Sequence, residues 1–442
     1  MILEFSIENY LSFKEKVTFS FEAASIKEHP DHVFETEDGK YNILLGALLY
    51  GANGSGKSNL IKSLSTMKDL VINSSKDKQV DEEIPVEFFK LSTETINKPS
   101  SFEVAIIQEG EYYRYGFSVS KEKIHREWLF TKSRSKEILL FSREFLRESN
   151  SYDFNIHHTF KDSDPIDPSI ARKNALFLSV NAQFNGNVSM QIVKWFSAIT
   201  FISGTNYSDF IEYTADLISE GTHRRFILEV LQAANLGFHD IKVQKKEITD
   251  EMLTGLPIEF KKLFLSSKNR NIINIRTIHT KRDHHGRKVG EVEFDLMTEE
   301  SLGSQKFFAL TGPILNSLVK GSLLVIDEFD ARLHPDLSKF IIQIFQNTTN
   351  NSRKAQFLFS SHNTQFLDRT LFRRDELFFI DKTDRESSYL YNINNMSKLI
   401  PDMPNVRNDA SFEKDYLEGK YGAVPFNKRN GRQLNLWDLI KD

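Results

Sequence analysis

The sequence predicts an α/β fold with a β-rich N-terminal lobe and an inserted helical and β-hairpin subdomain. Three observations support this prediction. The apolar strand at residues 42–50 runs into a glycine-rich loop, and a helical pattern follows directly. About 270 positions later, a second apolar strand ends in two acidic residues. The first 25 residues alternate between apolar and polar side chains, which is typical of strands.

Composition limits the classes of protein to consider. The chain has 442 residues, of which 40% are hydrophobic and 27% are charged, so we expect two or three domains, or one large domain with insertions. It contains no cysteine, which excludes disulfides, thiolate metal sites and a cysteine nucleophile. We find no signal peptide and no apolar run of about 18 residues, so we expect a cytoplasmic protein without a membrane partner. The net charge of −4 does not indicate a nucleic-acid-binding surface.

In the N-terminal half, the spacing of apolar residues predicts mostly strands and one helix. Strands are expected at residues 2–13, 16–25, 42–50, 121–130 and 174–184, with a helix at 58–73. Residues 101–120 predict a hairpin that turns at Glu109 and Gly110. Residues 133–175 are polar and weakly periodic, so we expect a loop with a short helical piece there.

The C-terminal half alternates between helices and strands. Residues 188–240 are expected to be mostly helical, and residues 271–297 predict a hairpin that turns near Gly286. Helices are then expected at 301–318 and 335–347, and strands at 322–330, 355–361 and 376–382. We divide the chain into an N-terminal head part, a β-rich lobe with a short arm, a helical and hairpin insertion, a C-terminal head part and a tail, at residues 1–64, 65–187, 188–298, 299–395 and 396–442.

Residues 51–58 match the phosphate-binding pattern G-x-x-x-x-G-K-[ST]. Its glycines allow backbone N–H groups to converge on phosphate oxygens, and the helix that follows offers its positive end to the same anion. Lys57 would reach the β- and γ-phosphates, and the Ser58 hydroxyl would bind Mg²⁺. We therefore predict ATP and Mg²⁺ as cofactors, with nucleotide contacts from Gly51, Asn53, Gly54, Ser55, Gly56, Lys57, Ser58 and Asn59.

The second apolar strand delivers Asp327 and Glu328 to its end. Asp327 suits a role in the Mg²⁺ shell, and Glu328 could orient and polarise the attacking water. An acidic turn after a buried strand is the alternative explanation. With the phosphate-binding loop upstream, the pair predicts an ATPase that converts ATP and water to ADP and phosphate.

The long separation of these two motifs resembles the ABC-type P-loop ATPase heads of SMC, RecF and OLD-like proteins. In that family a signature segment before the acidic strand contacts nucleotide bound to the other subunit. The resemblance implies this role for Ser301, Gly303, Ser304 and Gln305. Leu302 departs from the serine that is usual in the signature, and a simple helix N-cap is the alternative explanation of the segment.

Three further segments extend the resemblance. The strand at 355–361 delivers His362, which resembles the switch histidine that touches the γ-phosphate. Residues 330–337, "DARLHPDL", resemble the loop between the acidic strand and the next helix in OLD-like ATPases. Gln183, after the strand expected at 174–184, is our candidate for the glutamine that senses Mg²⁺ and the attacking water.

Segments along nearly the whole chain, among them "FSIENYLSFKE", "NALFLSVNAQFN" and "FEKDYLEGKYGAVPF", resemble the short OLD-like or RloA-like ATPases of bacterial anti-phage defence loci of Septu, PARIS and retron-linked type. We see no acidic cluster of the kind that a TOPRIM nuclease needs after His362. The resemblance therefore implies a sensor or switch subunit that dimerises, or forms a higher oligomer, around ATP and controls a separate effector nuclease or toxin.

Two other functions remain open from the sequence. A RecF-like DNA-repair clamp would use a basic patch, and the densest basic segment contains Lys281, Arg282, Arg287 and Lys288. His279, His284 and His285 accompany this segment and are expected to be exposed residues rather than metal ligands. A scaffold that binds ATP without hydrolysing it is the second alternative, and the presence of Glu328 argues against it.

Overall fold

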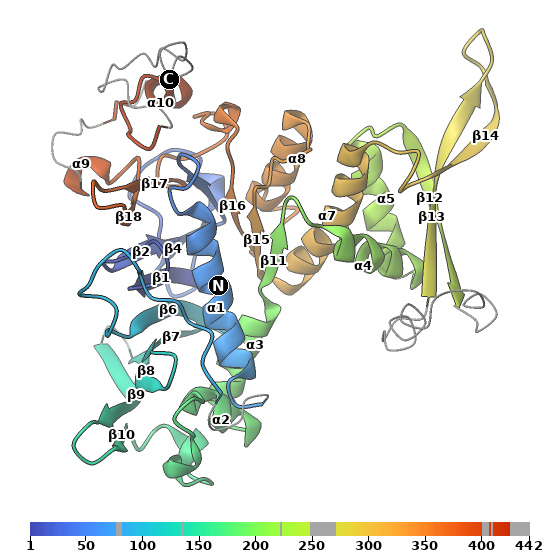
Figure 1. Cartoon of the computed structure of the whole chain (residues 1–442). Helices are drawn as coiled ribbons and strands as arrows, with labels where there is room; N and C mark the ends of the chain where they lie inside the picture. Colours follow the sequence, from blue (N-terminus) through green and yellow to red (C-terminus); the bar gives the residue numbers. More distant parts are fainter. Residues whose placement is uncertain are drawn as a thin grey trace, which may run out of the picture.

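The computed structural model describes residues 1–76, 82–133, 136–221, 223–247, 271–399, 406–407 and 410–424. Within these ranges the strands form sheets of seven, six, three and two members. Figure 1 shows the seven-stranded lobe at the lower left of the view and the three-stranded sheet on the right, while the six-stranded sheet runs from the upper left, at β17 and β18, to the middle, at β15 and β11. The mixture of helices and strands confirms the predicted α/β class.

The seven-stranded sheet forms the β-rich lobe, and all of its pairings are antiparallel. In spatial order its strands are β10 (Ser151–Ile156), β9 (Lys136–Leu146), β8 (Ile124–Ser133), β7 (Glu111–Val119), β6 (Ser100–Gln108), β1 (Ile2–Glu8) and β2 (Val17–Ser20). The predicted hairpin between β6 and β7 is confirmed, because Glu109 and Gly110 form its turn with φ angles of 53° and 85°. Positive φ at both central residues is typical of a two-residue hairpin turn.

The prediction of a loop with a short helical piece at residues 133–175 is wrong for much of that segment. β9 and β10 occupy it and extend the sheet to its edge, and only the short 3₁₀ helices at Lys161–Ser163 and Pro168–Ile170 follow. Side chains along β10 alternate between exposed and half-buried positions. Every second side chain of β10 faces solvent and is polar. The segment therefore contains few apolar residues and was predicted as a loop.

The six-stranded sheet joins segments that are far apart in the sequence. In spatial order it contains β11 (Thr200–Ser203), β15 (Leu323–Asp327), β16 (Gln356–Ser360), β5 (Gly46–Tyr50), β17 (Leu377–Lys382) and β18 (Ser388–Asn392). Every pairing is parallel except that between β17 and β18. The loops that follow β5, β15 and β16 therefore meet at one edge of the sheet, which is where open parallel sheets bind ligands.

Both faces of the six-stranded sheet are buried. Ala47 and Leu49 of β5 belong to a core shared with the seven-stranded sheet and helix α1 (Lys57–Asn73). Leu48 and Tyr50 belong to a second core shared with α7 (Leu302–Lys320) and α8 (Pro335–Gln346). This double burial explains why β5, β15 and β16 are almost continuously apolar in the sequence.

The segment expected to form one strand at residues 42–50 forms two. β4 (Asn42–Leu44) pairs with β3 (Val33–Glu35), and β5 begins two residues later in the six-stranded sheet. A short 3₁₀ helix, η1 (Pro30–His32), precedes β3. Because an apolar run has no period, it does not reveal where the chain passes from one sheet to the next.

Residues 177–183 form a helix, α2 (Phe177–Gln183), where we expected a strand. The backbone N–H groups of Phe177 and Leu178 donate hydrogen bonds of 2.7 and 2.9 Å to the buried carboxylate of Glu127. This carboxylate satisfies the first turn of α2 and complements its helix dipole. The prediction failed because short apolar runs do not distinguish a buried helix from a buried strand.

The predicted helical segment contains α3 (Asn187–Ala198), α4 (Ser208–Ser219) and α5 (Arg224–Ala233), and β11 interrupts the helices. α3 packs against α1 and α2, whereas α4 and α5 pack against α7. A three-stranded antiparallel sheet follows, with β12 (Phe238–Glu247), β13 (Asn271–Arg282) and β14 (Lys288–Asp295). Gly286, with a φ of 78°, lies in the β13–β14 turn, as predicted. Figure 1 shows this sheet projecting away from the rest of the molecule.

Both large sheets cross the boundaries that we drew in the sequence. β1 and β2 pair within the sheet of β6 to β10, and β11 pairs with β15. In the described part of the tail lie α9 (Met396–Leu399) and α10 (Phe412–Leu417), and the rest of 396–442 lies largely outside the described residues. None of the described helices combines the length and apolarity that crossing a membrane requires.

Candidate nucleotide-binding site

The predicted phosphate-binding loop lies at the C-terminal end of β5, where the chain turns into α1. Gly51, Gly54 and Gly56 have φ angles of 153°, 77° and 121°, which L side chains rarely adopt. A Cβ atom on Gly51 would lie 2.3 Å from the Ile380 carbonyl oxygen, and one on Gly56 would lie 2.5 Å from Ser388 Oγ. The shape of the loop therefore requires glycine at Gly51 and Gly56.

Two polar side chains of the loop are suited to a phosphate. Ser55 Oγ is buried and has no hydrogen-bond partner among the described residues. Lys57 is also buried, and its ammonium group donates to the carbonyl oxygens of Gly51 (2.7 Å) and Ala52 (3.1 Å). A buried hydroxyl without a partner is uncommon in proteins. A phosphate oxygen would accept hydrogen bonds from both groups, so the loop fits a nucleotide phosphate.

The acidic pair is held by the strands on either side of β15. The hydroxyl of Ser360 donates to Asp327 Oδ1 (2.5 Å) and accepts from the Glu328 N–H (2.8 Å). Glu328 has a φ of 51°, which is uncommon for a residue other than glycine. On its other side the Gly204 N–H donates to the Asp327 carbonyl oxygen (2.6 Å). The backbone at the acidic pair is therefore fixed by both neighbouring strands.

The phosphate-binding loop, the acidic pair and His362 line one cleft of about 320 Å³. The loop and the start of α1 contribute Asn53, Gly54, Ser55, Gly56, Lys57, Ser58 and Asn59 to its lining. His362 follows β16, and its backbone N–H approaches Asp330 Oδ1 at 3.4 Å. Three segments that were assigned separately in the sequence thus meet at one edge of the six-stranded sheet.

The charges in the cleft affect one another. Burial lowers the pKa of Lys57 to about 8, although Asp327 and Glu328 act in the opposite direction. Desolvation, and next the positive charge of Lys57, lower the pKa of His362. His362 is therefore a neutral imidazole at neutral pH, with one nitrogen that donates a hydrogen bond and one that accepts.

The predicted signature segment starts α7 and does not line this cleft. Ser301 is the N-cap, and its hydroxyl accepts a hydrogen bond from the Ser304 N–H at 3.1 Å. Leu302 is 53% exposed. A Cβ atom on Gly303 would lie 3.0 Å from the Arg332 carbonyl oxygen, so the segment packs against the loop that follows the acidic pair. The helix-cap explanation is correct, and it is compatible with a signature role.

Two predicted glutamines do not face the cleft. Gln305 is buried, and its amide donates to the carbonyl oxygens of Met297 (3.2 Å) and Glu300 (3.0 Å), so it holds the loop before α7. Gln183 ends α2 instead of following a strand, and it is not among the lining residues. α2 packs at the end of α1 that is remote from the phosphate-binding loop, because Ser179 Oγ donates to the Val71 carbonyl oxygen at 2.6 Å. The prediction that a strand delivers Gln183 to the Mg²⁺ site is wrong.

Lys306 contacts the loop after Glu328, although the sequence analysis did not single it out. It lies in α7, is fully buried and donates to the carbonyl oxygens of Phe329 (2.9 Å) and Ala331 (2.7 Å), on both sides of Asp330. Burial lowers its pKa to about 8. A lysine within the apolar run "QKFFAL" is a recognisable signal, because buried lysines need partners. Lys306 thus ties the signature helix to the loop that follows Glu328.

The basic residues of the β13–β14 hairpin lie at its exposed tip. Asp283 holds the turn by accepting from the N–H groups of His285 and Arg287, both at 2.9 Å. Lys288 pairs with Glu291 at 2.9 Å, whereas Lys281 and Arg282 are exposed. His279 lies further along β13, where its Nε2 contacts Glu300 at 2.8 Å, and His284 and His285 are exposed at the turn.

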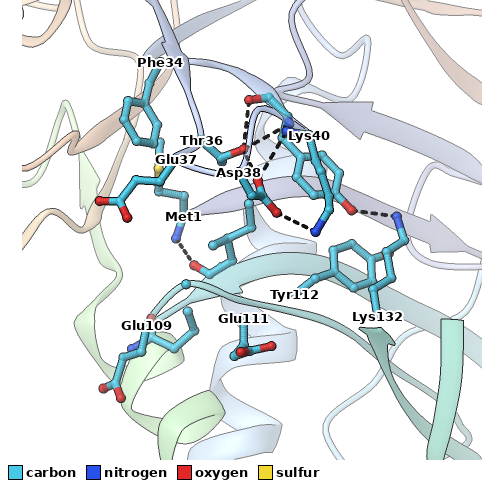
Figure 2. A pocket seen from close by; sticks show the side chains of 14 residues that line it. Met1, Phe34, Thr36, Glu37, Asp38, Lys40, Glu109, Glu111, Tyr112 and Lys132 are labelled. Atoms are coloured by element: carbon cyan, nitrogen blue, oxygen red, sulfur yellow. Dashed lines mark hydrogen bonds and ion pairs between the residues drawn. The ribbon is translucent and has the colours of Figure 1, made fainter. Parts of the chain in front are cut away.

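A larger cavity of about 640 Å³ lies between the β3–β4 connection and the β6–β7 turn. Figure 2 shows the Met1 amino group donating to Ile107 (2.5 Å) and Lys132 donating to the Tyr41 hydroxyl (2.7 Å). Burial lowers the pKa of the Met1 amino group to about 5. The acidic residues that line this cavity outnumber its lysines; they are Glu37, Asp38, Glu109 and Glu111. A nucleotide triphosphate would be repelled here, so this cavity does not compete with the glycine loop.

Comparison with solved structures finds distant similarity to SMC head domains and to RecF. The SMC head domain from Thermotoga maritima matches with 14% sequence identity and a TM-score of 0.37, over 88% of this chain and 98% of that chain. The SMC head domain bound to the C-terminal domain of ScpA from Pyrococcus furiosus matches with 11% identity and a TM-score of 0.35, over 88% and 96%. The recombination mediator protein RecF with ATP, of the RecFOR pathway, matches with 12% identity and a TM-score of 0.31, over 88% and 97%. No curated protein matches the chain.

The sequence also matches one protein family over residues 47–368, a range that begins in β5 and ends shortly after His362. This range includes the phosphate-binding loop, the signature segment and the acidic pair, and it covers well over half of the chain. The phosphate-binding loop follows β5 and the acidic pair ends β15, two strands of the six-stranded sheet, and α7 packs against one face of that sheet. The chain belongs to the family described as "AAA domain, putative AbiEii toxin, Type IV TA system".

Proposed function

We propose that the chain binds and hydrolyses ATP in a dimer of heads, and that it acts as the sensor or switch subunit of an anti-phage defence system. In this proposal the ATP cycle controls a separate effector nuclease or toxin. One observation supports ATP hydrolysis most directly. The glycine loop with Lys57 lines the same cleft as Asp327, Glu328 and His362. These are the residue types that phosphoryl transfer to water needs.

Each residue of the cleft has a chemical role in this proposal. The N–H groups of the loop and the Lys57 ammonium would bind the phosphates, while Ser58 and Asp327 would bind Mg²⁺. When bound, Mg-ATP supplies the phosphoanhydride bond and a metal that neutralises phosphate charge. Glu328 would accept a hydrogen bond from the attacking water and orient it. His362 would donate a hydrogen bond to the terminal phosphate from its neutral ring.

A second copy of the chain would complete the site. The signature segment lies at the N-terminus of a 19-residue helix, away from the cleft of its own chain. Helix N-termini attract anions, and the exposed segment around Gly303 would meet the nucleotide bound to a partner head. Lys306 would transmit this contact to the Glu328 loop through its bonds to Phe329 and Ala331. ATP binding would then close the dimer, and hydrolysis would open it.

The defence role rests on resemblance. The chain resembles the OLD-like and RloA-like ATPases of anti-phage loci, and the family that it belongs to is described by a toxin of a Type IV TA system. Both point toward a system in which an ATPase is paired with a second component. A closed and an open state of the heads are the kind of two-state element that could restrain and release such a component.

A RecF-like DNA clamp is the second candidate, and one observation favours it. The β13–β14 hairpin projects from the body of the molecule (Figure 1) and carries the exposed side chains of Lys281, Arg282 and Arg287 near its tip. A projecting basic tip suits contact with a phosphate backbone. Glutamates on the same sheet reduce this charge, because Glu291 pairs with Lys288 and Glu293 pairs with Lys242.

The ATPase proposal is tested with two variants of the cleft. Lys57→Ala should abolish ATP binding, whereas Glu328→Gln should bind ATP like the wild type and lose turnover, because a neutral amide does not accept a proton from water. Binding and phosphate release are measured on the same preparations. Normal hydrolysis by Glu328→Gln protein would exclude Glu328 as the group that activates water.

The effector proposal is tested with the same Glu328→Gln protein, which should stay closed in Mg-ATP. The tagged protein is recovered from its native host, and the bound protein and nucleic acid are identified. Lys57→Ala protein is the control, since it should not close. ATP-dependent recovery of a nuclease or toxin encoded by a neighbouring gene is the expected result. Recovery of DNA with recombination proteins, and no such effector, would favour the clamp instead.

A further inference from the structure

A second cluster of ligand-type side chains lies outside the nucleotide cleft, on the short helix η1. His29, Asp31 and His32 each offer one ligand atom, and these three atoms lie within 4.8 Å of one another. His32 is buried, His29 is half-buried and Asp31 is exposed. The cluster is therefore anchored on one side and open to solvent on the other.

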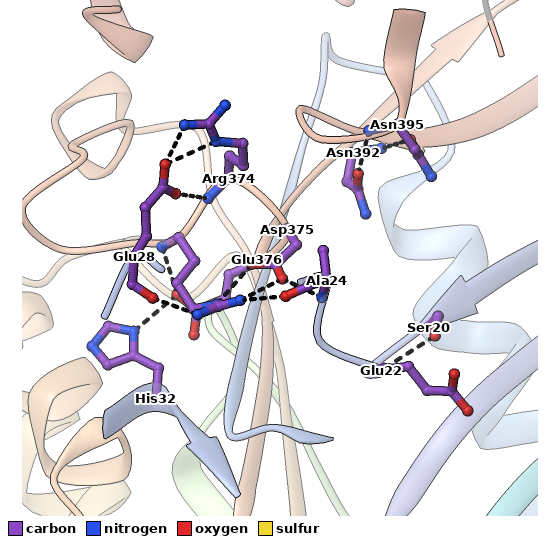
Figure 3. Close-up of polar contacts among 11 residues, drawn as sticks. Ser20, Glu22, Ala24, Glu28, His32, Arg374, Asp375, Glu376, Asn392 and Asn395 are labelled. Atoms are coloured by element: carbon purple, nitrogen blue, oxygen red, sulfur yellow. Dashed lines mark hydrogen bonds and ion pairs between the residues drawn. The ribbon is translucent and has the colours of Figure 1, made fainter. Parts of the chain in front are cut away.

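The second nitrogen of each histidine ring already has a partner. His32 Nδ1 lies 3.0 Å from Glu376 Oε2, as Figure 3 shows, and His29 Nε2 lies 2.8 Å from the Arg369 carbonyl oxygen. A carbonyl oxygen and a carboxylate oxygen both accept, so each of these nitrogens is the N–H of its ring. The other nitrogens, His29 Nδ1 and His32 Nε2, are then left with a lone pair. Histidines that bind metals have this arrangement almost without exception.

The backbone brings the two rings together. His29 has a φ of 36°, in the left-handed region that non-glycine residues rarely adopt. Pro30 follows it and fixes the next backbone angle. As a result the rings of His29 and His32 stack with their centres 4.7 Å apart and their planes 17° from parallel. A strained residue that places two imidazoles side by side is typical of a functional position.

The charge balance beneath His32 also favours a cation. Glu376 is fully buried, and its Oε1 has no hydrogen-bond partner among the described residues. Two neighbouring arginines are bound to other carboxylates, as Figure 3 shows in part: Arg373 pairs with Asp375 and Arg374 with Glu28. The side chains of these arginines therefore do not neutralise the Glu376 carboxylate. A cation bound to His32 Nε2 would supply positive charge near it.

We propose that His29, Asp31 and His32 form a binding site for Zn²⁺, with Glu376 and the Arg369 carbonyl oxygen orienting the two histidines. Two imidazoles and one carboxylate match the ligand preference of this ion and leave a fourth position for water. The ion ties η1 to the segment between residues 369 and 376, which leads into β17.

The proposed metal site is separate from the nucleotide cleft. The Glu376 carbonyl oxygen accepts a hydrogen bond of 2.9 Å from the Leu48 N–H of β5. This places the site toward the beginning of β5 and β17, whereas the phosphate-binding loop follows the end of β5. Loss of the metal site should therefore leave ATP binding intact, so this inference and the proposed ATPase function fail independently.

The test uses chelator-treated full-length protein in millimolar Mg²⁺, with Co²⁺ as a spectroscopic probe and Zn²⁺ as its competitor. We expect one Co²⁺ per chain, with the visible absorption of a four-coordinate ion, which Zn²⁺ displaces. His29→Ala and Asp31→Asn change half-buried or exposed side chains, and each should weaken Co²⁺ affinity by at least about tenfold. Circular dichroism and ATP binding check that both variants fold.

His285→Ala is the matched control, because it removes an exposed histidine beside another histidine at a turn. Its Co²⁺ affinity should equal that of the wild type. The proposal is overturned if the wild type binds no stoichiometric Co²⁺, or if His29→Ala and Asp31→Asn bind it as tightly as the wild type. Equal loss of binding in His285→Ala would also overturn it.

Discussion

Lys57 combines two properties that a phosphate-binding lysine needs. Its ammonium group is buried against the carbonyl oxygens of Gly51 and Ala52, so it is desolvated before any ligand arrives. The same burial lowers the pKa of Lys57 to about 8. The lysine therefore loses its charge only slightly above neutral pH, and a bound anion would favour the charged form. At the residue scale the site is thus sensitive to pH through Lys57.

We predict that ATP affinity weakens as the pH rises above about 8. The free chain loses the Lys57 proton with a pKa of about 8, whereas bound phosphates need the charged ammonium. Binding must then take up a proton, and Kd should rise by up to about tenfold per pH unit. The measurement is a binding titration from pH 7 to about pH 9.5 with Glu328→Gln protein, which avoids turnover.

Lys57→Arg in the same background is the control for this prediction. A guanidinium stays charged over the whole range, so the affinity of this variant should be weaker but independent of pH. If the affinity of the Glu328→Gln protein depended on pH no more steeply than that of the Lys57→Arg variant in the same background, Lys57 would not govern the pH dependence.

At the scale of elements, the contact between β11 and β15 positions the acidic pair. Gly204 directly follows β11 and lies beside the backbone of Glu328, and a Cβ atom there would lie 1.9 Å from the Glu328 carbonyl oxygen. β11 was not predicted in the sequence, because four residues between two helices give little periodic signal. This short strand nevertheless fixes where Glu328 can lie.

Gly204→Ala should therefore lower kcat while leaving ATP binding almost unchanged. The added methyl group displaces Glu328 but does not touch the glycine loop that holds the phosphates. A displacement of about 1 Å can reduce the rate on the order of 100-fold. Gly290→Ala is the control, since a Cβ atom there meets nothing within 4 Å. A Gly204→Ala enzyme with wild-type kcat would contradict the proposed control of Glu328 by β11.

The buried pair of Glu127 and Arg143 connects β8 and β9 to α2. Glu127 accepts from the first N–H groups of α2, and Arg143 donates to the carbonyl oxygens of Ala175 and Arg172 at 3.0 and 3.1 Å. Both side chains are fully buried and lie 3.8 Å apart. This network replaces the side-chain cap that α2 lacks.

Glu127→Ala should lower the free energy of unfolding by about 3–5 kcal/mol, because it leaves Arg143 buried without its carboxylate. Urea denaturation measures the change. Glu144→Ala removes an exposed partner of Arg126 on the neighbouring strand and should cost less than about 1 kcal/mol. Equal effects of the two substitutions would mean that the buried pair is not a structural anchor.

At the scale of the whole molecule, the sequence predicted the parts of the site that form short motifs directly after an apolar strand. The glycine loop, the acidic pair and His362 each follow a strand of one parallel sheet, so their apolar strands and polar ends were visible locally. Gln183 was expected to follow a strand but lies at the end of a helix, because a short apolar run does not distinguish the two. Lys306 and Gly204 were not predicted from the sequence, since only the folded chain brings them to the Glu328 loop. The nucleotide contact expected of Gln305 stays a prediction.

The division of the chain was harder to predict than its motifs. β1 and β2 belong to the seven-stranded sheet, whereas β5 belongs to the six-stranded one. One apolar run contains both β4 and β5, yet these two strands lie in different sheets. Strand pairing between residues far apart in sequence has no local signature. The two cores on either face of the six-stranded sheet each contain residues from both halves of the chain, so distant segments are packed into one head.

The central claim is that each ATP site uses the glycine loop of one chain and the signature segment of another. The most direct test mixes two inactive variants, Lys57→Ala and Gly303→Glu, and measures ATP hydrolysis. In a mixed dimer the intact loop of one chain meets the intact signature of the other, so hydrolysis should reappear. Lys57→Ala mixed with Glu328→Gln is the matched control and should stay inactive, because both changes disable the loop side of the site. Recovery in the first mixture only is the predicted result, and no recovery from stable mixed dimers would contradict the shared site.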